Sequence, residues 1–94
     1  MKTIWKFGFS TAALNSVALP KGADILCLQM QRFSPCMWAV VDPAQPTERR
    51  TFVLYGTGAT MVETGIHSYV GTYQELDGDL VWHLFELKEE ENNG

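Results

Sequence analysis

Short apolar segments, each ended by a proline or glycine turn, run through nearly the whole chain and restrict what it can fold into. Residues 3–9 alternate as a half-buried strand does, with Trp5, Phe7 and Phe9 on one face. No segment predicts a helix longer than one turn. Short strands at this spacing are typical of an all-β, antiparallel sandwich or small barrel. The six or seven predicted strands are residues 3–9, 16–19, 24–32, 36–41, 50–55, 66–74 and 79–87.

The middle of the chain predicts an antiparallel meander over residues 24–55. Residues 36–41 are apolar on both faces, which suits a central strand that is covered on both sides. Residues 50–55 are expected to pair with them. The intervening loop contains Pro43 and Pro46, which lack amide donors and cannot continue a ladder.

Alternation within residues 24–32 places Leu26, Leu28 and Met30 on one face of a strand. Gln29 and Gln31 lie on the opposite face. We therefore expect that opposite face to meet solvent or a partner.

The second half of the chain predicts a hairpin. Residues 66–74 and 79–87 are its strands, and Asp77 and Gly78 form a strong turn pair between them. Residues 59–65, just before the hairpin, fit either a helical turn or an irregular loop.

Length and charge narrow the class of protein. A chain of 94 residues is one domain, expected over residues 1–88, with an acidic and flexible tail at residues 89–94. The net charge of −4 argues against direct binding to nucleic acid. The apolar runs are too short to span a bilayer, and the N-terminus lacks the long apolar stretch of a signal peptide. We therefore expect a cytoplasmic protein.

The cysteines and histidines do not predict a disulfide framework or a metal site. Cys27 and Cys36 lie nine residues apart, and neither the Cys pair nor the His pair has the spacing of zinc ligands. Reduced, half-buried thiols are expected. The sequence predicts neither a bound metal nor a cofactor.

The candidate catalytic groups have simpler structural explanations. Gly56, Thr57 and Gly58 can form an anion-binding turn, but no Lys-Ser/Thr follows them as in a P-loop. His83 is expected to be half-buried and bonded to a backbone carbonyl, and His67 is expected to be exposed. Since no nucleophile motif is present, we expect a protein that is not an enzyme, and a hydrolase is the last alternative.

The aromatic content is high for so thin a core, with three Trp, three Tyr and five Phe residues. Strands that are apolar on both faces need cover on the second face as well. Self-association or a partner protein could supply that cover, and aromatic side chains often anchor such interfaces. We therefore expect partner binding, with a homo-oligomer as one form of it.

Several motifs in a fixed order carry a resemblance. They include Pro35-Cys-Met-Trp-Ala-Val-Val-Asp-Pro43 and Arg50-Thr-Phe-Val-Leu-Tyr-Gly-Thr-Gly58. Together with residues 19–26, 29–31, 70–74 and 80–86, they resemble a family of small uncharacterised bacteriophage and prophage proteins. In those relatives the Gly-Thr-Gly is often followed by histidine, where this chain has Ala59.

The resemblance implies a viral accessory protein that acts in the host bacterial cytoplasm. Small acidic phage proteins without catalytic signatures are often inhibitors of host defence, including anti-CRISPR proteins. The leading hypothesis is therefore an inhibitor that binds a host defence protein or complex. Its C-terminal carboxylates would face basic grooves of the partner, and they include Glu86, Glu89 and Glu90.

Two further hypotheses remain open from the sequence. An oligomeric sponge for a nucleotide messenger would use arginine for phosphate and an aromatic ring for the base. Its candidate residues are Arg49, Arg50, Tyr55, Gly56, Thr57 and Gly58. The other hypothesis is a structural or morphogenetic phage component.

Overall fold

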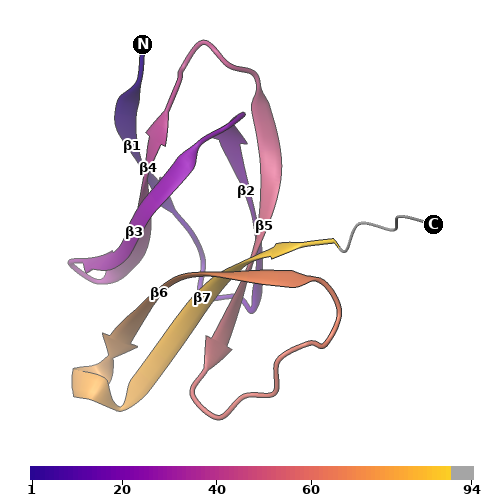
Figure 1. Ribbon diagram of the computed structural model, residues 1–94. Helices are drawn as coiled ribbons and strands as arrows, with labels where there is room; N and C mark the ends of the chain where they lie inside the picture. The colour runs from indigo at the N-terminus through magenta and orange to yellow at the C-terminus, as the bar shows by residue number, and fades with distance from the viewer. Residues whose placement is uncertain (90–94) are drawn as a thin grey trace.

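Alternating apolar residues and turn residues produce seven strands among residues 1–89, the part of the chain that the computed structural model describes (Figure 1). One sheet has the order β1-β4-β3 and the other has the order β2-β5-β7-β6. All neighbouring strands are antiparallel. The predicted all-β sandwich is confirmed, and the sheets do not close into a barrel. The strands are β1 (Thr3–Gly8), β2 (Leu14–Pro20), β3 (Asp24–Gln31), β4 (Ser34–Val41), β5 (Thr47–Gly56), β6 (Ile66–Glu75) and β7 (Leu80–Lys88).

The predicted meander over residues 24–55 is wrong at its last step. β4 is the central strand of its sheet, as expected, but β1 occupies the edge of β4 that β5 was expected to take. Both edges of β4 are therefore filled by β1 and β3. The loop that contains Pro43 and Pro46 carries the chain to the other sheet, where β5 lies between β2 and β7.

A bulge in β3 reverses part of the predicted alternation. The register with β4 shifts between Ile25 and Cys27, so Leu26 is the extra residue. Leu26 is 52% exposed, whereas Ile25, Leu28 and Met30 pack into or against the core. The prediction that Leu26 shares the face of Leu28 is therefore wrong, because one inserted residue shifts the alternation by one position.

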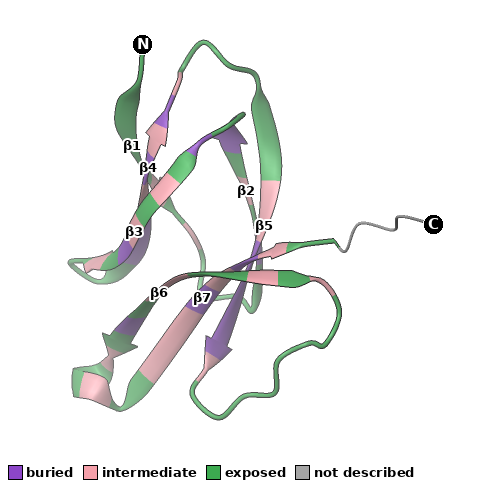
Figure 2. Cartoon of the chain, viewed as in Figure 1, coloured by how far each residue is buried: buried purple, intermediate pink, exposed green. Residues whose placement is uncertain are grey.

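The core lies between the two sheets (Figure 2). Its largest fully buried side chains come from both layers: Phe52, Leu19, Met37, Leu84 and Val41. Burying side chains of this size contributes about 1.5–3 kcal/mol each relative to exposure.

The two sheets contact each other where β3 meets β6. A Cβ built on Gly71 would lie 2.8 Å from the Cβ of Leu28, so only glycine allows this separation. β6 also shifts its register between Tyr69 and Gly71. The glycine and the bulge next to it therefore set the distance between the layers.

The hairpin prediction is confirmed, and the open question at residues 59–65 is answered. β6 and β7 pair along their length, from Ile66 opposite Lys88 to Glu75 opposite Leu80. The 3₁₀ turn η1 (Leu76–Gly78) joins them. Residues 59–65 form an irregular loop without helix. Among residues 1–89 there is no helix long and apolar enough to cross a membrane.

Candidate functional site

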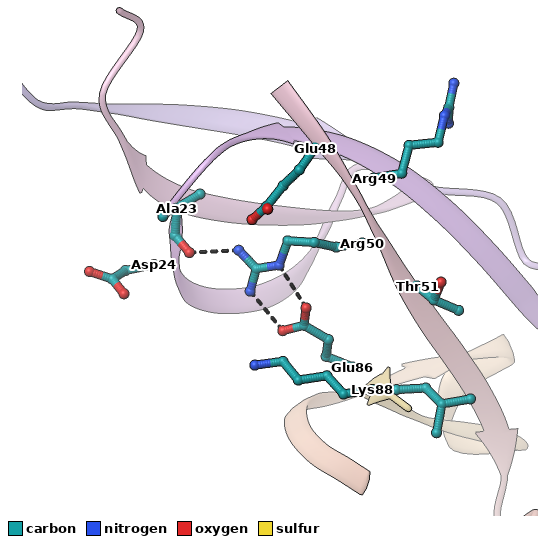
Figure 3. Close-up of a pocket in the computed structure, with 10 residues that line it drawn as sticks. Ala23, Asp24, Glu48, Arg49, Arg50, Thr51, Glu86 and Lys88 are labelled. Atoms are coloured by element: carbon teal, nitrogen blue, oxygen red, sulfur yellow. Dashed lines mark hydrogen bonds and ion pairs between the residues drawn. The ribbon is translucent and has the colours of Figure 1, made fainter. Parts of the chain in front are cut away.

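An ion pair joins Arg50 of β5 to Glu86 of β7 (Figure 3). The Nε and Nη2 of Arg50 donate to the two carboxylate oxygens of Glu86 at 2.6 and 2.7 Å. Nη1 donates to the carbonyl of Ala23 at 2.6 Å. The side chains of Arg50 and Glu86 are only 16% and 9% exposed. The pair therefore ties the turn before β3 to the four-stranded sheet.

Hydrogen bonding and charge shift the pKa values of both partners in the direction that favours the ion pair. The hydrogen bonds from Arg50 lower the pKa of the Glu86 carboxyl, although burial acts in the opposite direction. The same bonds raise the pKa of Arg50, and the negative charges of Glu48 and Asp24 raise it further. Both groups are therefore charged at neutral pH.

An open hollow of about 570 Å³ surrounds this pair. Asp24, Glu48 and Lys88 line it, while Arg49 is directed away from the pair (Figure 3). Three nitrogens of Arg50 already bond to protein acceptors. The Arg50 side chain is therefore committed to a structural contact and does not present a free guanidinium to a phosphate.

The residues predicted for a nucleotide site are not brought together within one chain. Arg49 and Arg50 are adjacent on β5, so their side chains point to opposite faces of the sheet. Tyr55 lies at the other end of β5, about 20 Å from Arg49 at the usual rise per residue. Gly56 is the last residue of that strand, and Thr57 and Gly58 form a turn after it.

The predicted acidic residues separate as well. Glu86 is a buried member of the ion pair and is not part of a tail. Glu89 is exposed just after β7. Glu90 and the rest of residues 90–94 lie outside the described part of the chain.

Tyr55 and His67 fix the loop of residues 57–65 over the outer face of the four-stranded sheet. The hydroxyl of Tyr55 lies 3.0 Å from Nε2 of His67 and accepts a hydrogen bond from the Val62 amide at 3.1 Å. Both rings pack against Phe85. The prediction that His67 is exposed is wrong, because it lies within β6 and is half-buried by this cluster.

His83 bonds to hydroxyl groups, so the expected backbone carbonyl partner is wrong. Its Nε2 lies 2.8 Å from Oγ1 of Thr57, and its Nδ1 lies 3.0 Å from Oγ1 of Thr72. The hydroxyl of Tyr69 lies 2.6 Å from the same Thr72 oxygen. A nucleophile–histidine pair normally has a third group, often a carboxylate, orienting the histidine. A threonine occupies that position here. Through His83, the hydrogen bonds join Thr57, in the turn after β5, to Thr72 of β6.

The turn between β6 and β7 contains an unusual leucine. The amide of Asp79 donates to the carbonyl of Leu76 at 3.0 Å, and the two central residues, Asp77 and Gly78, have φ of 54° and 92°. Positive φ at both is what a type I′ turn requires. Leu76 also has a φ of 52°, which this turn does not require. Leucine in the left-handed region costs about 1–2 kcal/mol.

Packing compensates little for the strain at Leu76, because the residue is 68% exposed. In sequence, Glu75 and Asp77 flank it, Asp79 follows at the end of the turn, and Leu80 is a second exposed leucine. We call residues 75–80 the acidic tip. Backbone strain that serves no packing often marks a functional position.

The sequence predicts Asp77 as a turn residue and gives no prediction for Leu76. The available signal was an apolar residue placed directly before an Asp-Gly turn. Elsewhere, residues 1–89 contain no group of three or more His, Cys, Asp or Glu side chains that could hold a metal ion. The acidic tip is identified by the exposure and the positive φ of Leu76, two properties that the sequence alone does not give.

Comparison with known families finds a match over the full sequence. The model of a domain of unknown function, DUF7352, matches residues 1–94. The chain belongs to the DUF7352 family. The match runs through the C-terminal acidic residues, which lay outside the resemblance to phage proteins. No curated protein and no solved structure matches the chain.

Membership of DUF7352 assigns no function to any residue of this chain, so candidate functional residues come from the geometry of the fold. Two features stand out on the DUF7352 domain: the internal Arg50–Glu86 pair, which stabilises the fold, and the acidic tip, which the fold presents to solvent.

Proposed function

We propose that this DUF7352 protein is a non-enzymatic binding domain that contacts a partner protein through the acidic tip. The observation that carries the proposal is Leu76, a large apolar side chain held 68% exposed in a left-handed conformation. A protein interface would bury this side chain. Full burial of a leucine contributes about 1.5–3 kcal/mol, which is enough to offset a strain of about 1–2 kcal/mol.

The charges of the acidic tip indicate the chemistry of the partner. Glu75, Asp77 and Asp79 lie within three residues of the exposed leucine in sequence, and residues 75–80 include no basic side chain. Energetically important interface residues are often apolar anchors inside a polar rim. The complementary surface is an apolar pocket bordered by lysine or arginine.

The biological setting of the proposal rests on the resemblance of the sequence motifs to small phage proteins. In that setting the partner is a host defence protein or complex in the bacterial cytoplasm, and the domain inhibits it. Complexes that handle nucleic acid have basic grooves, which suits an acidic contact element. Because Glu86 is paired with Arg50, the proposed contact with the partner is made by the acidic tip and not by Glu86.

The nucleotide sponge and the phage structural component receive no specific support from the geometry. The sponge would have to combine Arg49 of one subunit with Tyr55 of another, since one chain holds them at opposite ends of β5.

A capture experiment with matched variants tests the binding proposal. The tagged protein is immobilised and exposed to lysate of a bacterial host, and retained proteins are identified by mass spectrometry. Leu76→Ala should lose a protein that the wild type retains. Leu26→Ala removes an equally large leucine that is 52% exposed on β3, and it should retain that protein.

Charge provides a second, independent comparison. Asp77→Asn with Asp79→Asn keeps side chains that tolerate turn conformations but removes two charges. This variant should bind more weakly and with a flatter dependence on salt. If Leu76→Ala and the double Asn variant retain the same proteins as the wild type, the acidic tip is not the contact surface.

Phage plaquing tests the biological setting separately. On a host with an active defence system, expression of the wild-type chain should raise plaque numbers and Leu76→Ala should not. Equal plaque numbers with and without the chain, over a panel of defence systems, would contradict the inhibitor proposal while leaving protein binding intact.

A further inference from the structure

The four edge strands of the sandwich differ in how far they are protected from pairing with other strands. β3 and β6 both contain bulges and pack against each other. β2 ends in Pro20, which has no amide donor. β1 pairs with β4 in continuous register from Thr3 to Gly8, without a bulge or a proline. Bulges and prolines are common protection of an edge, and β1 has neither.

The side chains of β1 leave apolar surface exposed on both faces of its sheet. Ile4 is 59% exposed on the outer face, and Trp5 is 42% exposed on the face that carries the core. Lys6 is the only charged residue within the strand. Its Nζ donates to Oε1 of Gln31 at 2.7 Å, so the lysine lies across the sheet rather than beyond its edge.

We propose that two copies of this chain pair through β1, antiparallel about a two-fold axis. The pairing joins the two three-stranded sheets into one continuous sheet of six strands. It uses a surface separate from the acidic tip, and it does not depend on the proposed function.

Charge selects the register of this pairing. In an antiparallel pair, directly opposite residues have their side chains on the same face of the sheet. When a two-fold axis relates the two strands, this requirement places the axis beside a residue, so that residue lies opposite its own copy. Only two such registers pair five residues of the strand Thr3–Gly8. One centres on Lys6 and opposes two like charges, which is destabilising. The other centres on Trp5, and there Lys6 lies opposite Ile4 of the partner subunit.

The Trp5-centred register also covers the exposed apolar surface of β1. Trp5 lies beside Trp5 of the partner subunit, and aromatic cross-strand pairs contribute about 0.2–1 kcal/mol. Stable dimers bury about 800 Å² per partner, more than five paired edge residues supply. We therefore expect a reversible dimer whose population rises with protein concentration.

Sedimentation equilibrium tests the dimer directly. The apparent mass of the wild type should rise from 10.6 kDa toward twice that value as concentration increases. Ile4→Lys places a second lysine opposite Lys6 of the partner subunit and should hold the protein monomeric. Leu26→Lys adds the same charge at another exposed leucine and should dimerise as the wild type does. A wild type that stays monomeric at every concentration, or an Ile4→Lys variant that dimerises equally, would overturn the proposal.

Cysteine cross-linking tests the register. In a background of Cys27→Ser and Cys36→Ala, Trp5→Cys brings two thiols together, since facing Cα atoms lie about 4.5–5.5 Å apart, within the range of a disulfide. Thr3→Cys would separate them by about 13 Å, four residues along the strand. Trp5→Cys should therefore oxidise to a covalent dimer and Thr3→Cys should not.

If a dimer forms but Thr3→Cys cross-links as fast as Trp5→Cys, the register is wrong. Leu76→Ala should dimerise normally, which separates this proposal from the binding function.

Discussion

Arg50 and Glu86 form a bidentate ion pair that joins β5 to β7. Arg50 also donates to the carbonyl of Ala23, in the turn before β3. Both side chains point into the space between the sheets at the rim of the core. Two charges in that position are stable only with hydrogen-bond partners, and here each nitrogen of Arg50 and each carboxylate oxygen of Glu86 has one. The pair therefore acts as a clamp between the layers.

Removing one partner should destabilise the fold strongly. Glu86→Gln leaves the Arg50 charge without its counter-ion in a half-buried place, and we expect a loss of about 2–4 kcal/mol in the free energy of unfolding. Urea denaturation measures this value. Replacing both partners, with Arg50→Met and Glu86→Leu, should recover part of the loss because no isolated charge remains. A double variant less stable than Glu86→Gln would contradict this explanation.

Acid should weaken the same clamp. Arg50 lowers the pKa of Glu86 in the folded state below the unfolded value of about 4.3. The unfolded state therefore binds the proton first as pH falls. The stabilisation is fully present above that unfolded value and is lost as pH falls through the folded pKa. Urea midpoints between pH 7 and pH 3 should fall less for Glu86→Gln than for the wild type.

High pH should destabilise the fold through the deprotonation of Tyr73. Its side chain is 4% exposed, and burial, with a smaller effect from Glu75, raises its pKa to about 12. The unfolded tyrosine titrates near 10, so the unfolded state loses its proton first. Stability should decline between pH 10 and pH 12, by about 2 kcal/mol in total. Tyr73→Phe should lack this decline and lose little stability at neutral pH, since the buried hydroxyl has no hydrogen-bond partner among residues 1–89.

The separation of the sheets at Gly71 gives a steric prediction. A methyl group there would lie 2.8 Å from the Cβ of Leu28, so Gly71→Ala must push β6 away from β3. Overpacking of this kind costs about 1–3 kcal/mol. Gly8→Ala is the matched control, because a Cβ on Gly8 meets nothing within 4 Å. Thermal unfolding should show a lower midpoint for Gly71→Ala only.

Local periodicity was enough to predict the strands but not their partners. The β6–β7 hairpin followed from Asp77-Gly78, because a short turn leaves only one pairing. β5 was assigned to β4 because it follows β4 in sequence, yet β1 competed for the same edge. Long-range competition of this kind is not encoded in any local window. The bulge at Leu26 was missed for a related reason, since a single extra residue is defined only against the partner strand.

The candidate site was harder to predict than the fold. Glu86 belongs to the same acidic stretch as Glu89 in the sequence, but strand alternation turns its side chain inward to Arg50. Arg49 and Arg50 looked equivalent and point to opposite faces. Leu76 is an apolar residue directly before an Asp-Gly turn, but this pattern does not distinguish a strained, exposed leucine from an ordinary strand residue. Exposure and φ are properties of the folded chain, so this part of the site needed the structure.

The strain at Leu76 leads to a prediction in which stability and binding change in opposite directions. Leu76→Gly removes the penalty of a left-handed leucine, and the turn itself is kept by Asp77 and Gly78. We expect the free energy of unfolding to stay level or to rise by up to about 1 kcal/mol, measured by urea denaturation. The same variant should lose the captured partner, because the apolar anchor is gone. A chain selected only for stability would have no reason to keep leucine at this position. If Leu76→Gly instead destabilises the fold, Leu76 has a structural role and its exposure cannot be explained by partner binding.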